Sequence, residues 1–183
     1  MNLTGQIIVS MPSLEDERFY KTVIYICAHS SEGSMGIIIN KKIDYDLYPD
    51  LLQQLGIDKP LNNKKLFIRY GGPVESGRGF VLHSDDMVRK ETLNIDKGVA
   101  LTSTAEFFDD LSKSKGPKNC ILALGYAGWQ PGQLEYEIMR NSWMSLSVDN
   151  SFLFDDEVSR KWSQAYKLIG IDPNSLSSES GRA

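Results

Sequence analysis

The sequence has few of the residues that build metal or disulfide sites, with two cysteines and two histidines among 183 residues. Cys27 and Cys120 each lie inside an apolar run, which predicts buried free thiols in a reducing compartment. Their number alone leaves a disulfide between them open. Because the four residues have no paired spacing, we expect no bound metal, and no motif calls for a cofactor.

The chain also lacks long hydrophobic runs. A bilayer-spanning helix needs about 20 apolar residues, whereas the longest runs here, "GIIIN" and "CILALG", have the length of strands. The opening segment "MNLTGQIIVSM" has neither the basic region nor the apolar stretch of a secretory signal. We therefore expect a cytoplasmic protein that does not associate with membranes.

An excess of positive charge is missing as well. The formal net charge is -4, and lysines and arginines are scattered among acids. Proteins that bind nucleic acid through its phosphates usually carry a basic face, and no helix-turn-helix pattern is visible either. No nucleic-acid partner is expected.

The residues that are present are those of a folded domain. Hydrophobic residues make up 41% and charged residues 24% of the chain, an ordinary balance for a globular protein. The length favours one domain. We expect it to span residues 1–173, followed by a flexible polar tail at 174–183 that has almost no apolar content.

Apolar periodicity predicts strands first and a mixture of strands and helices later. A β-hairpin is expected where "TVIYICA" and "MGIIIN" are joined by the polar loop "HSSEGS". Ser103 and Glu106 have the spacing of a helix capping box. The further strands are expected at 5–11, 64–72, 79–84, 98–103, 119–129 and 143–148, and the helices near 49–56, 103–111, from 131 onward and at 155–169. This order predicts an α+β domain with a mixed, strongly curved sheet and helices packed outside it.

Two glycine-rich stretches are the candidate functional features. "GYAGWQPGQLE" contains Gly128 and places Tyr126 and Trp129 where they can stack on a planar group, while Gln133 lies in the first turn of an expected helix. Glycine permits positive φ and close backbone approach, at a conformational cost. The stretch is therefore either one wall of a ligand pocket or only a bend that lets a strand leave its sheet.

The second stretch, "YGGPVESGRGF", has Gly71 and Gly72 at a wide turn between two strands. Arg78 either pairs locally with Glu75 three residues away, which we favour, or meets an anion. We predict that both stretches face each other and line one pocket that binds a small molecule.

The two histidines stand at the ends of expected strands. His29 and His83 are in positions suited to acid–base chemistry, yet a partly buried histidine with one satisfied hydrogen bond is the commoner case. Cys27, Ser30 and Ser31 are candidate nucleophiles, and none lies in a recognised activating motif.

Three blocks of the sequence resemble the signature blocks of the AlgH/YqgE family: "MPSLEDERFYKTVIYICAHSSEGSMGIIINK", "YGGPVESGRGFVLH" and "LGYAGWQPGQLEYEIMRNSW". The resemblance implies a bacterial, cytoplasmic α+β protein with a barrel-like mixed sheet, and it implies no activity. One branch of the family is named for regulation of alginate synthesis. Gln130 and Ser34 depart from the pattern, where related sequences commonly have glycine and alanine.

The first functional hypothesis is a non-enzymatic, regulatory protein that binds a small molecule or a protein partner. Its predicted site residues are Gly71, Gly72, Arg78, His83, Tyr126, Gly128, Trp129 and Gln133. A hydrolase or transferase with His29 or His83 as base is the alternative, with the amides of the glycine turns stabilising negative charge. A DNA-binding regulator is a third reading, disfavoured by the acidic balance.

Overall fold

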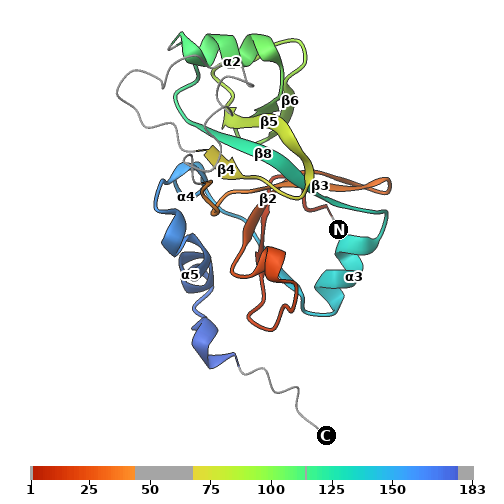
Figure 1. Cartoon of the computed structure of the whole chain (residues 1–183). Helices are drawn as coiled ribbons and strands as arrows, with labels where there is room; N and C mark the ends of the chain where they lie inside the picture. Colours follow the sequence, from red (N-terminus) through yellow and green to blue (C-terminus); the bar gives the residue numbers. More distant parts are fainter. Residues whose placement is uncertain (1, 44–67, 114, 177–183) are drawn as a thin grey trace, which may run out of the picture.

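The computed structural model describes residues 2–43, 68–113 and 115–176, and its elements are shown in Figure 1. The strands are β1 (Ile7–Ser10), β2 (Val23–Ser30), β3 (Gly33–Ile38), β4 (Ile68–Tyr70), β5 (Val74–Ser84), β6 (Leu93–Asp96), β7 (Val99–Thr102), β8 (Cys120–Trp129) and β9 (Trp143–Leu146). The helices are α2 (Ala105–Ser112), α3 (Gln133–Met139), α4 (Asn150–Phe154) and α5 (Val158–Leu168), with short 3-10 turns η1 (Glu17–Phe19) and η3 (Pro173–Ser175). The α+β class predicted from the sequence is confirmed.

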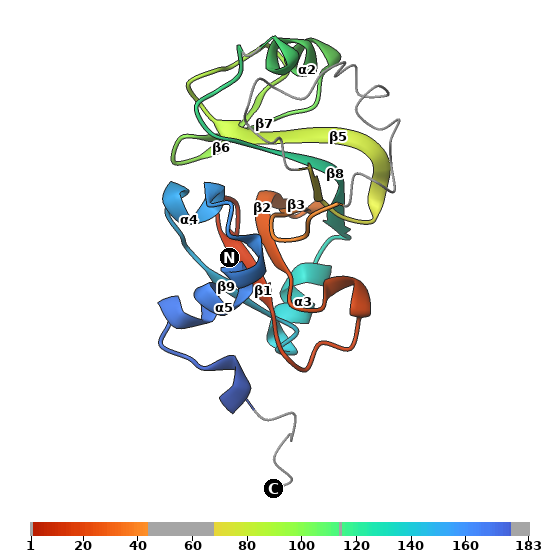
Figure 2. The same ribbon diagram turned by 60° about the vertical axis from the view of Figure 1, so that its left-hand side comes forward.

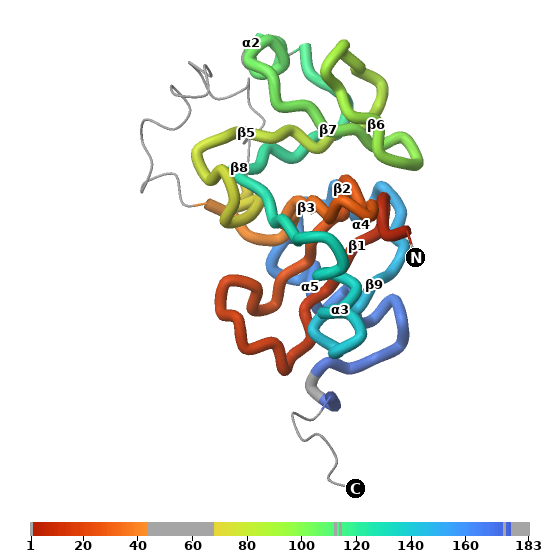
Figure 3. The backbone as a smooth tube through the Cα atoms, turned by 90° about the vertical axis from the view of Figure 1, so that its right-hand side faces the viewer, coloured from red at the N-terminus to blue at the C-terminus, as the bar shows by residue number. Residues whose placement is uncertain are grey.

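The strands form one mixed sheet in the order β6-β7-β5-β8-β3-β2-β1-β9, and β4 adds to β8 in parallel. Strand β8 joins two parts of this sheet, because its first half pairs with β5 and its last three residues pair with β3. Figure 3 shows β8 passing from the part that holds β5, β6 and β7 to the part that holds β1, β2 and β3. Among the described residues β6 and β9 do not pair with each other, so the sheet is open and the barrel-like closure is not confirmed.

Three apolar clusters explain where the helices lie. The central cluster fills the space between the two parts of the sheet and is covered by α4 and α5. In α5, the Trp162 indole N–H and the Tyr166 hydroxyl both donate to the carbonyl oxygen of Ser10, at 2.9 and 3.0 Å. A second cluster packs α2 on the outer face of β5 and β8, and a third packs α3 on β1, β2 and β3. Burial of these faces is the main favourable term in folding.

The β2–β3 hairpin differs from the sequence prediction. The polar segment "HSSEGS" was expected to be a loop, but β2 extends to Ser30 and β3 begins at Gly33, so Ser31 and Glu32 alone make the turn. The reason lies in the neighbouring strand: β8 pairs with residues 34–36 and holds the beginning of β3 in the sheet. His29 and Ser34 therefore face each other as a cross-strand pair.

Other predictions had mixed outcomes. Strand β8 runs over the predicted range, and Gly170, at φ 71°, follows α5 as expected of a helix cap. The capping box is wrong: Thr104 is the N-cap of α2 and makes no side-chain cap, and the Ser103 hydroxyl accepts a hydrogen bond from Arg78. Strand β6 and helix α4 were not predicted.

Some predictions fall outside the described part of the chain. The expected helix near 49–56 and the first residues of the strand at 64–72 lie there, as do residues 177–183 of the expected tail. Before them, η3 and Leu176 follow α5, and Leu176 packs against the central cluster. The domain boundary at 173 stays a prediction. No described helix is long and apolar enough to cross a membrane.

Candidate functional site

The two glycine-rich stretches meet where Gly71 and Gly72 cross β8 at Gly125 and Tyr126. The Gly71 N–H donates to the carbonyl of Leu124 at 2.8 Å. A Cβ on Gly72 would lie 2.0 Å from the carbonyl carbon of Tyr126, and one on Gly125 would lie 2.4 Å from the carbonyl oxygen of Gly72. Gly72 and Gly125 also have φ of 152° and 68°. The glycines therefore let two backbones touch, and this crossing leaves no space for a ligand.

Open space is found beside the crossing, beneath an arch formed by residues 74–79. Between the pairs Val74–Tyr126 and Gly79–Leu124, β5 has more residues than β8, so the arch rises away from its neighbour. Residues 74–78 are exposed, and a Cβ on Gly77 would meet nothing within 4 Å. Figure 2 shows the sharp bend of β5 at this point. A bulge of this size shapes a surface instead of strengthening the sheet.

A cleft of about 260 Å³ lies between the arch and the edge strand β6. Its floor is the margin of the central core, formed by Phe80 and Leu101 together with the ring of Tyr126, which meets Phe80 edge-on at 5.6 Å. Polar groups stand around this apolar floor. Among the described residues, those that line the cleft are Met35, Glu75, Arg78, Phe80, Glu91, Leu93, Leu101, Ser103 and Tyr126.

Arg78 is held in place by its neighbours. Its guanidinium donates to Glu75 at 2.9 Å and to the Ser103 hydroxyl at 2.8 Å, and it lies 5.0 Å above the Phe80 ring. The local ion pair favoured from the sequence is therefore present. Because Arg78 and Glu75 neutralise each other, Glu91 carries the remaining formal charge among the lining residues that the structure describes, and it is exposed.

His83 lies on the other face of β5. Its Nε2 is 2.9 Å from the hydroxyl of Thr102, its Nδ1 is 2.8 Å from the carbonyl oxygen of Ser84, and its ring packs on Phe107 of α2. Burial lowers the pKa of this imidazole below its ordinary value of 6.5. His83 does not line the cleft, and both of its nitrogens are engaged.

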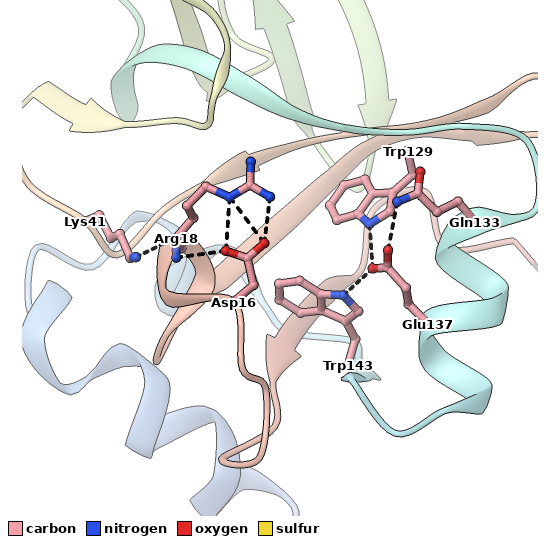
Figure 4. A network of polar contacts seen from close by, with 7 residues as sticks. All are labelled: Asp16, Arg18, Lys41, Trp129, Gln133, Glu137 and Trp143. Atoms are coloured by element: carbon pink, nitrogen blue, oxygen red, sulfur yellow. Dashed lines mark hydrogen bonds and ion pairs between the residues drawn. The ribbon is translucent and has the colours of Figure 1, made fainter.

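Trp129 and Gln133 belong to a separate network around Glu137, shown in Figure 4. One oxygen of the Glu137 carboxylate accepts from the indole N–H groups of Trp129 and Trp143, at 3.0 and 2.8 Å. The other accepts from the Gln133 amide at 2.8 Å, and Gln133 in turn accepts from the backbone N–H of Gln130. These contacts fix α3 against the sheet and use the polar atoms of both predicted site residues.

Gly128 lies close to the cleft without lining it. A Cβ at this position would be 3.3 Å from Cε2 of Tyr126, so the glycine leaves room for that ring. Of the eight residues predicted from the sequence, the cleft thus contains Arg78 and Tyr126. The other lining residues were not predicted; Met35, Glu91 and Ser103 come from parts of the chain outside the two glycine-rich stretches, and no pattern in the sequence links them to the cleft.

A second polar group lies at the β2–β3 hairpin. Nδ1 of His29 is 2.9 Å from Oγ of Ser34, and Nε2 is 3.4 Å from a carboxylate oxygen of Glu135 on α3. The two histidines therefore lie in different places and do not converge on one site. The sequence signal for this group was weak, because Ser34 and Glu135 lie in two different blocks far apart in the chain and no pattern pairs them.

Neither cysteine forms a disulfide; Cys27 is buried as expected, whereas Cys120 is only partly buried. Burial raises the pKa of Cys27 to about 12, so it is neutral at ordinary pH. Among residues 2–43, 68–113 and 115–176, no three histidine, cysteine or carboxylate side chains gather as a metal site. The predicted nucleophile Cys27 thus lacks the activation that thiol chemistry needs.

Comparison with known proteins gives one consistent answer. A family model described as AlgH-like matches residues 7–174. A UPF0301 protein of Rhodopseudomonas palustris is 49% identical, covering 99% of this chain and 89% of that protein, and one of Bradyrhizobium diazoefficiens is 47% identical over 99% and 88%. The solution structure of the AlgH protein from Pseudomonas aeruginosa superposes with a TM-score of 0.79 at 31% identity, over 100% of this chain and 97% of that one. Protein DIP2367 from Corynebacterium diphtheriae shares the fold, with a TM-score of 0.71 at 20% identity over 94% and 90% of the chains.

Proposed function

The chain belongs to the AlgH-like family, and from the geometry of its cleft we propose that it is a binding protein whose small ligand lies beneath the β5 arch. Its role at this cleft is regulatory, because a protein partner binds the ligand-bound state and not the ligand-free one. The proposal includes no reaction of the ligand there: among the described residues of the lining there is no histidine or cysteine, and the Ser103 hydroxyl has no adjacent base and accepts from Arg78.

The observation that supports this proposal is the arch itself. A strand that separates from its partner for several residues loses backbone hydrogen bonds of the sheet. Here the separation opens a cleft with an apolar floor and polar groups at its edge. Ligand sites commonly have this composition. A volume of about 260 Å³ is below the roughly 300–1,000 Å³ of sites for drug-sized molecules, so the ligand is small.

The charge of the lining indicates the kind of ligand. With Arg78 paired to Glu75, the exposed carboxylate of Glu91 attracts a cation. Tyr126 and Leu101 offer an apolar surface beside it. A small organic ammonium compound with an apolar body fits both features, because its ammonium group meets Glu91 while its body covers the floor.

The remaining predicted residues have supporting roles in this proposal. Gly71 and Gly72 allow the crossing that places the arch, and Gly128 leaves room for the Tyr126 ring. His83, Trp129 and Gln133 make no contact with the ligand. The proposal includes a cytoplasmic location and no contact with DNA, consistent with the formal charge of -4.

A thermal-shift screen tests the proposal. The panel contains small primary and quaternary amines with apolar bodies, matched carboxylates, sugar phosphates and nucleotides. A ligand that binds the folded state alone raises the melting temperature by roughly 5–10 °C at 100 times its Kd. We expect amines to do so, and we expect Glu91→Gln to weaken their binding about tenfold through the lost charge.

Glu106→Gln is the matched control, since Glu106 is an exposed carboxylate on α2 that does not line the cleft. Binding should be unchanged in this variant. If anions bind instead and Arg78→Gln weakens their binding, the cleft is still the binding site, but its ligand is negatively charged. If no class of compound raises the melting temperature, or if Glu91→Gln and Glu106→Gln behave alike, the proposed function is wrong.

A further inference from the structure

The side chains of Ser34, His29 and Glu135 form a group at the β2–β3 hairpin. They are arranged as a nucleophile, a base and an orienting carboxylate. Ser34 Oγ lies 2.9 Å from Nδ1 of His29, and Nε2 of the same ring lies 3.4 Å from Oε1 of Glu135. The imidazole side chain is 3% exposed, and the Glu135 side chain is 38% exposed. A nearly buried ring between a hydroxyl and a carboxylate has its orientation fixed on both sides.

The chemistry of the partners sets the tautomer. A carboxylate can only accept, so the Nε2 facing Glu135 carries the hydrogen. In the neutral ring with this tautomer, Nδ1 has a lone pair, and the Ser34 hydroxyl is placed to donate to it across the 2.9 Å between the two atoms. This is the protonation state in which a histidine can take a proton from serine, although the ring nitrogens are exchanged relative to the Ser–His–Asp triad of serine proteases.

The backbone holds Ser34 rigidly. Its strand is paired on both sides, with Ser34 opposite His29 on β2 and opposite Trp129 on β8. The next residue back, Gly33, has φ 127°, and a Cβ there would lie 2.5 Å from the carbonyl oxygen of Trp129. A reacting group on paired strands is positioned more precisely than one on a loop. Ser34 is only partly buried, so a reagent can reach it.

We propose that Ser34 is an activated nucleophile that accepts an acyl group from an activated ester. Oγ attacks the carbonyl carbon while its proton moves to Nδ1 of His29. The tetrahedral intermediate then collapses, the bond to the leaving alcohol breaks, and that alcohol takes the proton from Nδ1. The product is an ester of Ser34, and water activated by the same nitrogen hydrolyses it to the free acid and serine.

This site is independent of the cleft beneath the arch. Ser34 and Met35 are successive residues of one strand, and their side chains point to opposite faces: Met35 lines the cleft, whereas Ser34 faces His29 and α3. Because alanine is common at this position in sequences of the family pattern, the activity belongs to this chain and to relatives that have serine there.

The test uses the full-length protein and p-nitrophenyl acetate. Release of p-nitrophenol and an acetyl group mapped to Ser34 by peptide mass spectrometry are the expected results. Mapping needs no variant, so it stands even if a substitution unfolds the chain. His29→Gln should slow acetylation about 10²-fold or more by removing the base. Glu135→Gln should slow it less and alter the pH–rate profile through the imidazole that it orients.

Ser30→Ala is the matched control, because Ser30 lies on the same hairpin and its hydroxyl accepts the local N–H of Glu32. Its acetylation rate should equal that of the unchanged protein. A merely structural role for the group predicts acetyl groups spread over surface lysines and serines, with no dependence on His29. That result, or the absence of any label on Ser34, overturns the proposal. Neither outcome bears on ligand binding at the cleft.

Discussion

The two halves of the segment "YGGPVESGRGF" make opposite use of glycine. At Gly71 and Gly72 the chain lies so close to β8 that a single added carbon would overlap the backbone of Gly125 or Tyr126. At Gly77, five residues later, an added carbon would meet nothing within 4 Å. The comparison shows that a high density of glycine has two separate causes here: close contact between backbones in the first half, and an arch over open space in the second.

The largest expected effect is a loss of stability from a substitution in the first half of the segment, where the two backbones are in close contact. Gly72→Ala would place Cβ 2.0 Å from the carbonyl carbon of Tyr126, at a φ of 152° that side chains rarely adopt. Backbone cannot move aside as a side chain can, so we expect a loss of more than about 3 kcal/mol in the free energy of unfolding. Urea denaturation measures it.

Gly77→Ala is the control in the open half, with an expected change within about 0.5 kcal/mol. Similar losses for both variants would contradict the distinction between a sealed crossing and an open arch.

A smaller effect is expected at the network around Glu137. Glu137→Ala removes the acceptor of two indole N–H groups, on Trp129 and Trp143, whose residues are 8% and 3% exposed. Leaving buried donors without an acceptor costs about 1–3 kcal/mol. We expect a loss of about 2 kcal/mol and a change in tryptophan fluorescence.

Ligand binding by the same variant tests whether the network around Glu137 is separate from the cleft. Any folded fraction of Glu137→Ala should bind the ligand of the cleft with unchanged affinity. A large loss of affinity would instead return Trp129 and Gln133 to the binding site.

The smallest effect is a pH dependence from His83. Its folded-state pKa is lowered by burial, so the unfolded chain takes up a proton that the folded protein does not. Stability from this group is complete above the unfolded value of about 6.5 and falls as the pH drops toward the folded value, by no more than about 1.4 kcal/mol per pH unit. Denaturation at pH 7.5 and 5.5 should give a smaller difference for His83→Gln than for the unchanged protein. Equal differences would show that His83 does not titrate as its burial requires.

Much of the fold follows from local patterns. The run "NCILALGYAGW" is apolar on both faces and forms β8, a central strand with neighbours on both sides. Gly170 and Pro173 correctly mark the end of α5. In these cases hydrophobicity and backbone preference agree with the environment that the rest of the chain supplies.

The prediction failed where a distant partner decides the outcome. "HSSEGS" has the composition of a loop, yet Ser34 is in a strand because Trp129 pairs with it. Ser103 has the spacing of a cap, yet its hydroxyl binds Arg78. The same holds for the candidate site. Arg78 and Tyr126 belong to the two glycine-rich stretches and could be predicted, whereas Glu91 and Met35 reach the cleft through the order of the strands, which no local pattern encodes.

The most direct test of the central claim, that the ligand lies beneath the arch and not at the glycine crossing, is an NMR titration of 15N-labelled protein with the strongest amine from the thermal-shift screen. We predict that the amide signals that move most belong to residues 75–80, Glu91, Leu101, Ser103 and Tyr126. Signals of Trp129, Gln133 and His83 should stay in place. Shifts centred on Trp129 and Gln133, with the arch unaffected, would contradict the account.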